Sequence, residues 1–557
     1  MTTFHIQQFG CRATQADGAA LERQLLDRGC TQSPDPATAA IIVLNTCTVT
    51  AAADAQARAA IRKIHAQNPH ARVIVTGCYA QRAPEELSSL PGVTWVVGNS
   101  HKPQIPNLIT QIAPLVHVSA LNHPTVIPSE ARNPLFPSTA PDTPFHSFVG
   151  AQHVAPGFSN TLDSDMPSGP AQILSGDIFA HPEFLSAPIQ VGESHHTRPI
   201  LKIQDGCNNR CSFCIIPYVR GKSRSLPPED VIQEIQSLTS SHPPTSPVGQ
   251  PIPADHQHTR EIPVAQALLP VLPSSSHATP TASHSHSFSA REIVLSGINL
   301  GTYGRDLTPR VEFIDLLRRI LDETQIERLR ISSIEPQDVT QDLIDLFAQN
   351  DRIAQHFHMP LQSASDSILA AMHRWYRSEH YARRVQLIHD RLPNAALGAD
   401  VIAGFPGETE SDHAATLAFI DRHPFTYLHV FSYSSRPGTK AAQLPDQVPS
   451  HIIKRRAREL RALADQKSAA FRRAQIGCAQ RVLTLHRDEH SLNEQTGAAY
   501  TPALSSNYLR VQVPGIRPSN QWQDVLITAE EGNYLIGETV FTLDEISVPS
   551  VLSATSV

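Results

Sequence analysis

The chain is poor in charged residues and lacks any long apolar run. Charged residues are only 17% of its 557 residues, and the formal net charge is −7. This balance argues against a uniformly basic surface for nucleic acid, although it is compatible with a local basic patch. No run of 18 or more apolar residues occurs, and the N-terminus has no basic stretch followed by an apolar one. We therefore expect a cytoplasmic protein with no membrane-spanning helix and no export signal.

Cysteine is also scarce, with eight residues in the whole chain. So few cysteines do not form the disulfide framework of a secreted protein. In a reducing compartment, cysteines are more often metal ligands or catalytic groups. Six of the eight fall into the two groups described below, whereas Cys30 and Cys478 have no such placement and are expected to pack in the interior.

Three cysteines stand close together in the stretch GCNNRCSFC, where Cys207, Cys211 and Cys214 follow a CxxxCxxC spacing. Three thiolates hold three corners of a four-iron cube and leave the fourth iron free to bind a small molecule. The spacing therefore favours a catalytic iron–sulfur cluster over simple electron storage. The alternative is a zinc site, which needs a fourth ligand, and no Cys or His lies in the next dozen residues.

The first part of the chain alternates between strand and helix patterns. Strands are expected at 4–6, 41–44, 72–75 and 94–97, with helices at 18–29, 51–68 and 84–90, which predicts a small open α/β sheet. Cys11, Cys47 and Cys78 each follow one of the first three strands. Because ligands gather at the carboxyl ends of strands in such sheets, we expect these three sulfurs to converge. The other interpretation is that they are ordinary buried small residues.

Two segments, 117–197 and about 241–289, are repeatedly broken by Pro, Ser and His, and the first has no Lys and no Cys. They bury too little apolar surface to offset their ordering entropy, so we expect disordered insertions. Between and after them, strands alternate with helices, which predicts parallel units closing toward a partial (β/α) barrel. The strands are expected at 200–203, 292–295, 328–331, 356–359, 397–402 and 427–431. The helices are expected at 228–238, 311–323, 366–373, 378–391 and 410–422.

A basic helix at 449–473 precedes a small all-β barrel, with strands at 479–485, 508–513, 523–528 and 534–541. The concentration of arginine on this helix, in a protein of net negative charge, favours a phosphate-binding face. The alternative is a solvated amphipathic helix. The candidate RNA-binding residues are Lys454, Arg455, Arg458, Arg472 and Arg473.

Several motifs together resemble the methylthiotransferases, a family of radical S-adenosylmethionine (SAM) enzymes. The matching sequence motifs are NTCTVTAAADAQAR (45–58), TGCYAQ (76–81), VVGNSHK (96–102), KIQDGCNNRCSFCIIPYVRGKSRS (202–225), HMPLQSASD (358–366), DVIAGFPGETE (400–410) and HVFSYSSRPGTKAA (429–442). The resemblance covers nearly all of the chain except the two insertions, and the last part is similar to the RNA-binding TRAM module. One departure is Thr14, where the family usually has Asn, which leaves that contact near Cys11 in doubt.

The resemblance implies a division of the chain. An N-terminal domain would occupy 1–116, a first insertion 117–197, a radical SAM core 198–446 interrupted at about 241–289, a basic linker helix 447–473, a TRAM-like barrel 474–545 and a tail 546–557. It also implies SAM and two [4Fe-4S] clusters as cofactors. Cys207, Cys211 and Cys214 would hold the catalytic cluster that binds and cleaves SAM. Cys11, Cys47 and Cys78 would hold an auxiliary cluster.

Other residues would contact SAM by the same resemblance. Phe213 would shield the cluster, Ser296 and Gly297 would meet the methionine amino group, Glu335 and Gln362 would make polar contacts, and Gly404, Pro406 and Gly407 would let the backbone approach the adenosyl group. For each of these, a plain turn or packing role is the alternative.

The implied reaction adds a methylthio group to C2 of N6-threonylcarbamoyladenosine at position 37 of tRNA. The implied partners are the tRNA anticodon stem-loop, an electron donor such as flavodoxin or ferredoxin, and an unspecified sulfur donor. Two sibling activities are alternatives, on isopentenyladenosine in tRNA and on an aspartate of a ribosomal protein. A hypothesis of another class is a non-enzymatic iron–sulfur RNA sensor, which would leave the SSIEP and GFPGET motifs unexplained.

Overall fold

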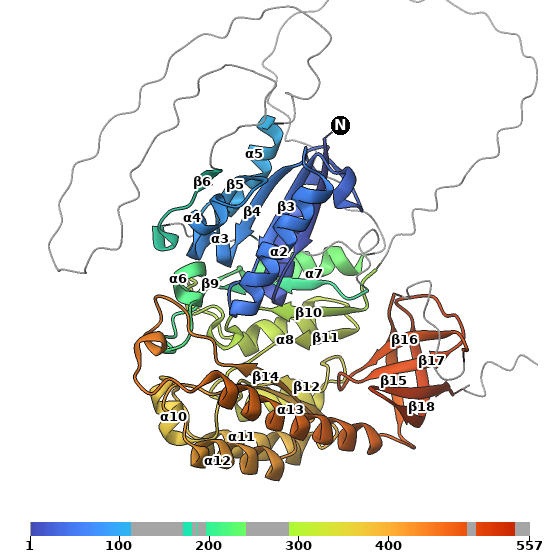
Figure 1. The fold of residues 1–557 in the computed structure, drawn as a ribbon. Coiled ribbons are helices and arrows are strands. Elements are labelled where there is room, and N and C mark those ends of the chain that lie inside the picture. The colour runs from blue at the N-terminus through green and yellow to red at the C-terminus, as the bar shows by residue number, and fades with distance from the viewer. Residues whose placement is uncertain are drawn as a thin grey trace, which may run out of the picture.

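The computed structural model describes residues 2–112, 171–180, 185, 197–240, 289–486 and 497–540, and every statement below concerns these residues. They form an N-terminal sheet, a central barrel-like unit and a C-terminal barrel (Figure 1). Most of the two predicted insertions and the predicted tail lie outside the described residues.

The N-terminal unit is a parallel six-stranded sheet in the order β2-β1-β3-β4-β5-β6. Its strands are β1 (Thr3–Gln8), β2 (Thr31–Gln32), β3 (Ile41–Thr46), β4 (Arg72–Gly77), β5 (Val93–Gly98) and β6 (Gln172–Leu174). Its helices are α1 (Arg12–Leu26), α2 (Ala51–Gln67), α3 (Cys78–Arg82), α4 (Pro84–Ser88) and α5 (Ile105–Ile112).

Strand β3 is buried along its whole length because helices cover both faces of the sheet. Ile42 and Leu44 pack with α2 in one core cluster, whereas Ile41 and Val43 pack with α1 and α5 in another. This continuous apolar run is typical of a parallel strand covered on both faces. Since the strands are parallel, the carboxyl ends of β1, β3 and β4 meet at one edge.

The central unit contains two parallel three-stranded sheets, β7-β10-β11 and β12-β13-β14, joined by a bridge between Leu329 and Ile353. The strands are β7 (Ile200–Lys202), β10 (Glu292–Ser296), β11 (Arg328–Ile331), β12 (His356–His358), β13 (Ala396–Ala403) and β14 (Tyr427–Ser432). The helices are α6 (Ile216–Arg220), α7 (Pro228–Thr239), α8 (Phe313–Glu323), α9 (Gln341–Gln349), α10 (Asp366–Ala371), α11 (Ser378–Arg391) and α12 (Glu410–Arg422). A short antiparallel pair, β8 (Gln204–Asp205) with β9 (Arg224–Ser225), flanks the CxxxCxxC loop.

The two faces of these strands differ in chemistry, because successive side chains point to opposite faces. One face carries apolar residues such as Leu295, Leu329 and Val401, which pack in the main core cluster. The other face carries polar residues on every strand. These are Lys202, Glu292, Ser296, Arg328, Arg330, His356, His358, Asp400, Tyr427 and His429. A barrel that served only stability would fill its interior with branched apolar side chains, so this polar lining indicates a binding site.

Helix α13 (Ser450–Arg473) leads to the closed C-terminal barrel, in the order β15-β16-β17-β19-β18. Its strands are β15 (Ala479–Thr484), β16 (Tyr500–Ser505), β17 (Arg510–Pro514), β18 (Trp522–Glu531) and β19 (Tyr534–Thr539). Arg328 and Arg330 reach across to it: their guanidinium groups donate to the backbone oxygens of Leu504 and Ser506, each at 3.0 Å. Glu292, which is 0% exposed, holds both arginines in place.

The structure differs from the sequence-based expectations at a few elements. The segment 117–197 is expected to be disordered, but within it β6 pairs with β5 and covers the open edge of the sheet. Strand β16 was not predicted. Cys30 packs in a core cluster as expected. The expectation that Cys478 packs in the interior is wrong, because this residue is exposed just before β15.

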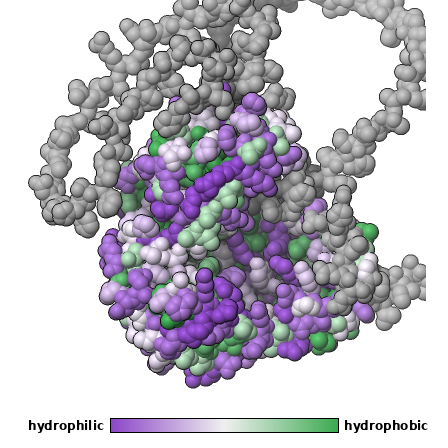
Figure 2. All heavy atoms as spheres, viewed as in Figure 1, coloured by the Kyte–Doolittle hydropathy of each residue, from purple (hydrophilic) through white to green (hydrophobic). Residues whose placement is uncertain are grey.

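The face of the molecule in Figure 2 is mostly hydrophilic and is hollowed between the N-terminal unit above and the lower units. Among the described residues, no helix has both the length and the apolar character needed to cross a membrane.

Candidate active site with two cysteine triads

Cys11, Cys47 and Cys78, here called the N-terminal triad, follow β1, β3 and β4 at one edge of the sheet. Cys11 is the residue before α1, Cys47 follows the last residue of β3, and Cys78 opens α3. Gly10 lets two of these loops meet, because a Cβ at Gly10 would lie 2.3 Å from Cys47 Cβ and 2.8 Å from its Sγ. The backbone at Gly10 also has φ +104°, which other residues rarely adopt.

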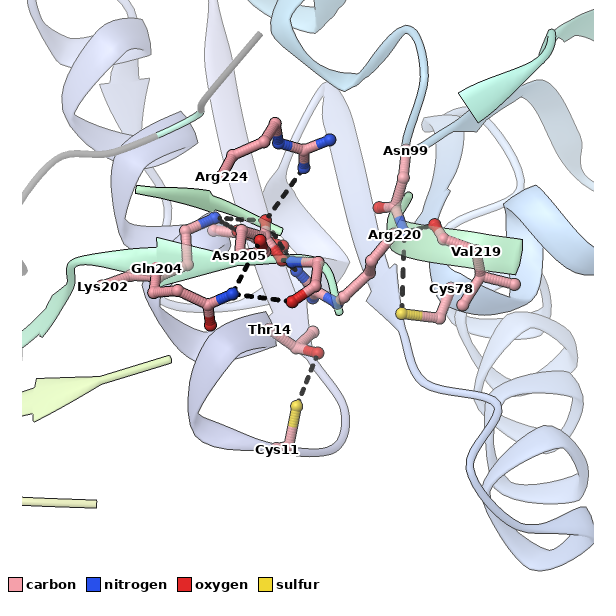
Figure 3. Close-up of polar contacts among 12 residues, drawn as sticks. Cys11, Thr14, Cys78, Asn99, Lys202, Gln204, Asp205, Val219, Arg220 and Arg224 are labelled. Carbon is pink, nitrogen blue, oxygen red and sulfur yellow. Dashed lines mark hydrogen bonds and ion pairs between the residues drawn. The ribbon is translucent and has the colours of Figure 1, made fainter. Parts of the chain in front are cut away.

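The three thiols of this triad interact electrostatically. Burial, and after it the neighbouring thiolates of Cys78 and Cys11, raise the pKa of Cys47 to about 12. Polar groups contact two of the sulfurs: Thr14 Oγ1 lies 3.5 Å from Cys11 Sγ, and Asn99 Nδ2 lies 3.6 Å from Cys78 Sγ (Figure 3). The three cysteines therefore lie at one edge of the sheet within electrostatic range of one another, and Thr14 makes a contact of its own in this loop.

Cys207, Cys211 and Cys214, here called the central triad, lie in the loop between β8 and α6. The loop is anchored to the residues around the end of α10, because Ser212 Oγ donates to the backbone oxygen of Ala371 at 2.8 Å. Burial raises the pKa of Cys214 to about 12, with Cys211 as the next cause. Donors face the other sulfurs: Asn209 N–H lies 3.4 Å from Cys207 Sγ, and Arg374 Nη1 lies 3.2 Å from Cys211 Sγ.

The spacing of the sulfurs distinguishes a cluster from zinc. Tetrahedral zinc, with Zn–S bonds of about 2.3 Å, brings its sulfurs within about 3.8 Å of one another. All six cysteines lie among the described residues, and in neither triad do the three sulfurs all lie within 4.8 Å of one another. A four-iron cube, in which each sulfur binds a separate iron, does not require sulfurs as close as a single zinc ion does.

Several of the expected SAM contacts surround the central triad. Glu335 forms an ion pair with Arg374, the same arginine that contacts Cys211. Phe213 packs edge-on against Phe405, with ring centroids 6.4 Å apart, next to the Gly404–Gly407 turn. Gln362 has φ +62°, a strained conformation that often marks a functional site.

For other expected contacts the structure supplies a packing role. A Cβ at Gly404 would lie 2.4 Å from Ile453 of α13, and a Cβ at Gly297 would lie 2.7 Å from Leu300. Gly407 has φ +80° but open space around it. Ser296 is buried at the end of β10, and Pro406 is buried in the turn before α12.

Inside the barrel, His358, Asp400 and His429 bring three possible metal-ligand atoms within 4.8 Å of one another. Both imidazoles contact the same Asp400 oxygen, His358 Nε2 at 3.0 Å and His429 Nδ1 at 3.2 Å. The Tyr427 hydroxyl lies 3.0 Å from His358 Nδ1 and 2.7 Å from His356 Nε2. These side chains form a continuous hydrogen-bonded chain whose members have partners without an ion.

A buried group of charges joins the two triad-bearing units, and we call it the interdomain ion cluster. It consists of Asp17 and Lys102 from the N-terminal unit and Lys202, Asp205 and Arg220 from the central one. Arg220 donates to Asp17 at 2.9 Å and to Asp205 at 2.9 Å, and Lys102 donates to Asp17 at 2.8 Å. Lys202 pairs with both carboxylates. Figure 3 shows the side chains of Lys202, Asp205 and Arg220 close together, with dashed lines marking their contacts.

Several residues of the ion cluster fall within the family motifs quoted above, but the sequence does not show which residues Arg374 and Arg220 contact, because those partners lie far away along the chain. Arg374 meets Cys211 across 163 positions, and Arg220 meets Asp17 across 203. Arg12, next to Cys11, similarly donates to the Tyr508 hydroxyl of the C-terminal barrel at 3.1 Å.

The five basic residues expected to bind RNA separate into two groups. Lys454, Arg458 and Arg473 are exposed on α13. Arg472 is buried and its Nε donates to Glu530 of β18 at 2.7 Å, so it attaches the helix to the barrel. Arg455 pairs with Glu410 and with Glu459 on its own helix.

Comparisons with known protein families agree with this geometry. The family described as "Radical SAM superfamily" matches residues 201–243 and 290–420, and "Uncharacterized protein family UPF0004" matches residues 3–98. The fold and the two triads thus define a radical SAM enzyme with an additional N-terminal domain.

Curated relatives are similar over nearly the whole chain. The threonylcarbamoyladenosine tRNA methylthiotransferase MtaB of Bacillus subtilis is 30% identical, over 92% of this chain and 91% of the relative. The MtaB of Aquifex aeolicus is 29% identical, over 94% and 99%. The tRNA-2-methylthio-N(6)-dimethylallyladenosine synthase of Syntrophobacter fumaroxidans is 29% identical, over 88% and 87%. The chain belongs to the radical SAM tRNA methylthiotransferase family, and it is an enzyme that transfers a sulfur-containing group.

Members of this family use SAM and [4Fe-4S] clusters. The residues present fit these groups. Each triad offers three sulfurs at a spacing wider than a single zinc ion requires, and polar donors contact a sulfur in both. Donors aimed at the sulfurs are typical of cluster sites, where they tune the reduction potential.

Proposed function

We propose that this enzyme adds a methylthio group to C2 of N6-threonylcarbamoyladenosine at position 37 of tRNA. The observation that carries the proposal is the pair of triads, which lie in adjoining units joined by the interdomain ion cluster. Two relatives that match almost the whole chain are named as threonylcarbamoyladenosine enzymes. A relative named for dimethylallyladenosine is nearly as similar, so the isopentenyl-type base is the second candidate.

The division of labour follows from the two triads. The central triad would hold the SAM-binding cluster and the N-terminal triad the auxiliary one. When bound, the clusters supply the electron that cleaves SAM to a 5′-deoxyadenosyl radical and an iron at which sulfur is delivered. The chain's own residues bind and orient: Arg374 holds Cys211 and Glu335 together, and Phe213 with Phe405 forms an apolar wall beside the loop. Ser296, Gly297, Gln362, Gly404 and Pro406 complete the proposed SAM contacts.

The target base would lie against the inner face of β14. Tyr427, His429 and Phe431 alternate along this face, and Leu428 and Val430 pack in the core on the other. His429 is 57% exposed at its side chain and Phe431 is 38% exposed, although both point toward the barrel interior. An exposed aromatic ring inside a polar lining suits a base taken out of its stack. Phe431→Ala would raise KM for tRNA and leave SAM binding unchanged, whereas an unchanged KM would exclude this surface.

The RNA-binding part would comprise α13 and a TRAM-like C-terminal barrel. Lys454, Arg458 and Arg473 are the exposed cations of the predicted set, suited to phosphates of the anticodon stem-loop. We propose the domain limits given above, 1–116, 198–446 and 474–545, and a cytoplasmic location, where tRNA is modified. A low-potential donor such as flavodoxin or ferredoxin would supply electrons.

Mass spectrometry of tRNA nucleosides tests the proposal. Deleting the gene should remove the 2-methylthio-threonylcarbamoyl nucleoside and accumulate its unthiolated precursor. Wild type and Cys478→Ala should restore it, since Cys478 belongs to neither triad, whereas Cys47→Ala and Cys211→Ala should not. Loss of the isopentenyl nucleoside instead would make the second candidate correct. No change in any nucleoside would make the ribosomal-protein activity the leading one.

A further inference from the structure

The interdomain ion cluster is not electrically balanced. It holds three cations, Lys102, Lys202 and Arg220, against two carboxylates, Asp17 and Asp205, and all five side chains are at least nine-tenths buried. Burial alone would raise the pKa of Asp17, but Lys102, Lys202 and Arg220 outweigh it and hold that pKa well below its ordinary value. Among the described residues, cations outnumber carboxylates at this site, and Arg224 adds a further guanidinium 3.7 Å from Asp205. Such an excess of buried cations over carboxylates favours a bound anion beside them.

The Arg220 end of the interdomain ion cluster adjoins the N-terminal triad. The Arg220 guanidinium interacts electrostatically with Cys11, Cys47 and Cys78. Cys78 packs against Ile215 and Val219 in the segment that ends at Arg220.

Arg220 also has an unused donor. Its Nη atoms bond to the two carboxylates, but its buried Nε–H has no hydrogen-bond partner among the described residues. Buried N–H groups nearly always have an acceptor, so this donor is available to one bound at the neighbouring N-terminal triad.

An iron–sulfur cluster on the N-terminal triad meets both requirements. An oxidised four-iron core has a charge of two plus, so binding to three thiolates gives it one net negative charge. Reduction by one electron raises this to two negative charges. A buried guanidinium beside it balances the charge and stabilises the reduced state more than the oxidised one. Positive charge and hydrogen bonds to the sulfurs are established ways to raise the reduction potential of such clusters.

We propose that Arg220 is the counter-cation of the cluster on the N-terminal triad and raises its reduction potential. It is a positioning residue: Asp205, two residues before Cys207, holds it from the central loop, and Asp17 holds it from α1. The same contact therefore fixes the two triads relative to each other. This inference rests on the proposed ligand role of Cys11, Cys47 and Cys78.

The test uses the full chain with Cys207, Cys211 and Cys214 replaced by Ala, so that only the N-terminal cluster is present. Iron and sulfide analysis first establishes loading, and a redox titration followed by EPR then gives the midpoint potential. Arg220→Gln removes the charge and Arg220→Lys keeps it without the Nε–H. Arg456→Gln is the matched control, because Arg456 is also buried, paired with carboxylates and left with a free Nε, but in another interface.

The midpoint should fall in both Arg220 variants, further in Arg220→Gln, and remain at the parent value in Arg456→Gln. If Arg220→Gln does not fold, the pair Asp205→Asn with Arg220→Gln is compared with Asp205→Asn alone, and its midpoint should be the lower of the two. Equal midpoints at equal iron content would overturn the role of Arg220 and leave the proposed function intact. A parent chain that binds no cluster would overturn the ligand assignment itself, and the role of Arg220 with it.

Discussion

Replacing Glu292 by Gln should loosen the attachment of the C-terminal barrel. Glu292 is 0% exposed and pairs with Arg328 and Arg330, whose guanidinium groups bond to backbone oxygens at the end of β16. A neutral amide at this position would leave two buried cations without their anion. Tyr508, which Arg12 contacts beside the N-terminal triad, lies in the same part of the barrel, so this attachment also borders the site.

The expected magnitude follows from the burial. Removing one partner of a buried ion pair costs about 3–5 kcal/mol. We take the lower end because Gln keeps one oxygen acceptor for the arginines. At about 1.4 kcal/mol per tenfold change, this is roughly a hundredfold rise in the undocked population. Burial raises the pKa of Glu292, but Arg330, Arg328 and Arg198 outweigh it and hold the pKa below its ordinary value. The ion pair therefore contributes fully above the ordinary Glu pKa, and the effect should be equal at pH 6 and pH 8.

Hydrogen exchange followed by mass spectrometry measures this directly. The slowest amides of residues 500–514 should exchange roughly a hundredfold faster in Glu292→Gln. Glu538→Gln, an exposed glutamate in the same barrel, is the control and should leave them within a few fold. Unchanged protection in Glu292→Gln would refute the reasoning that this buried pair docks the barrel.

Three further predictions concern the triads. Gly10→Ala should abolish cluster loading at the N-terminal triad, because the added Cβ would overlap Cys47. The protein should then lose about half of the iron that two four-iron clusters hold. The control Gly29→Ala, which also has a positive φ but open space around it, should load normally. In the iron-free protein, iodoacetamide should label Cys214 tenfold faster per pH unit between pH 7 and 10, because its pKa is raised to about 12 and only the thiolate reacts; labelling that is flat with pH would contradict this. Arg374→Gln should lower 5′-deoxyadenosine formation at least tenfold, roughly 1.4 kcal/mol, since it leaves Glu335 unpaired beside Cys211; near-normal formation would show that this contact is dispensable.

The sequence predicted the elements that carry strong periodic or motif signals. Apolar runs located most strands of the three parallel sheets to within a few residues, and parallel topology then brought Cys11, Cys47 and Cys78 to one edge. Strand β16 was missed because Pro502 interrupts a residue pattern that is otherwise typical of a strand. Strand β6 was missed because three residues inside a Pro-rich segment carry too little periodicity.

The charged contacts could not be predicted, because their partners are set by tertiary packing. Arg220 and Arg472 look alike in the sequence as basic residues near other basic residues. In the structure, Arg220 pairs with Asp17 from another unit, and Arg472 pairs with Glu530 from the C-terminal barrel. Local charge density therefore predicted an RNA-binding surface for both halves of α13 but could not distinguish exposed cations from buried ones.

The most direct test of the account is to measure both products in one reaction of the purified, cluster-loaded chain with SAM, a reductant and undermodified tRNA. Wild type should form 5′-deoxyadenosine and the methylthio nucleoside. The chain with Cys11, Cys47 and Cys78 replaced by Ala should still form 5′-deoxyadenosine but no methylthio nucleoside, and the chain without the central triad should form neither. Methylthio nucleoside from the chain that lacks the N-terminal triad would contradict the central claim that the two triads have separate and necessary roles.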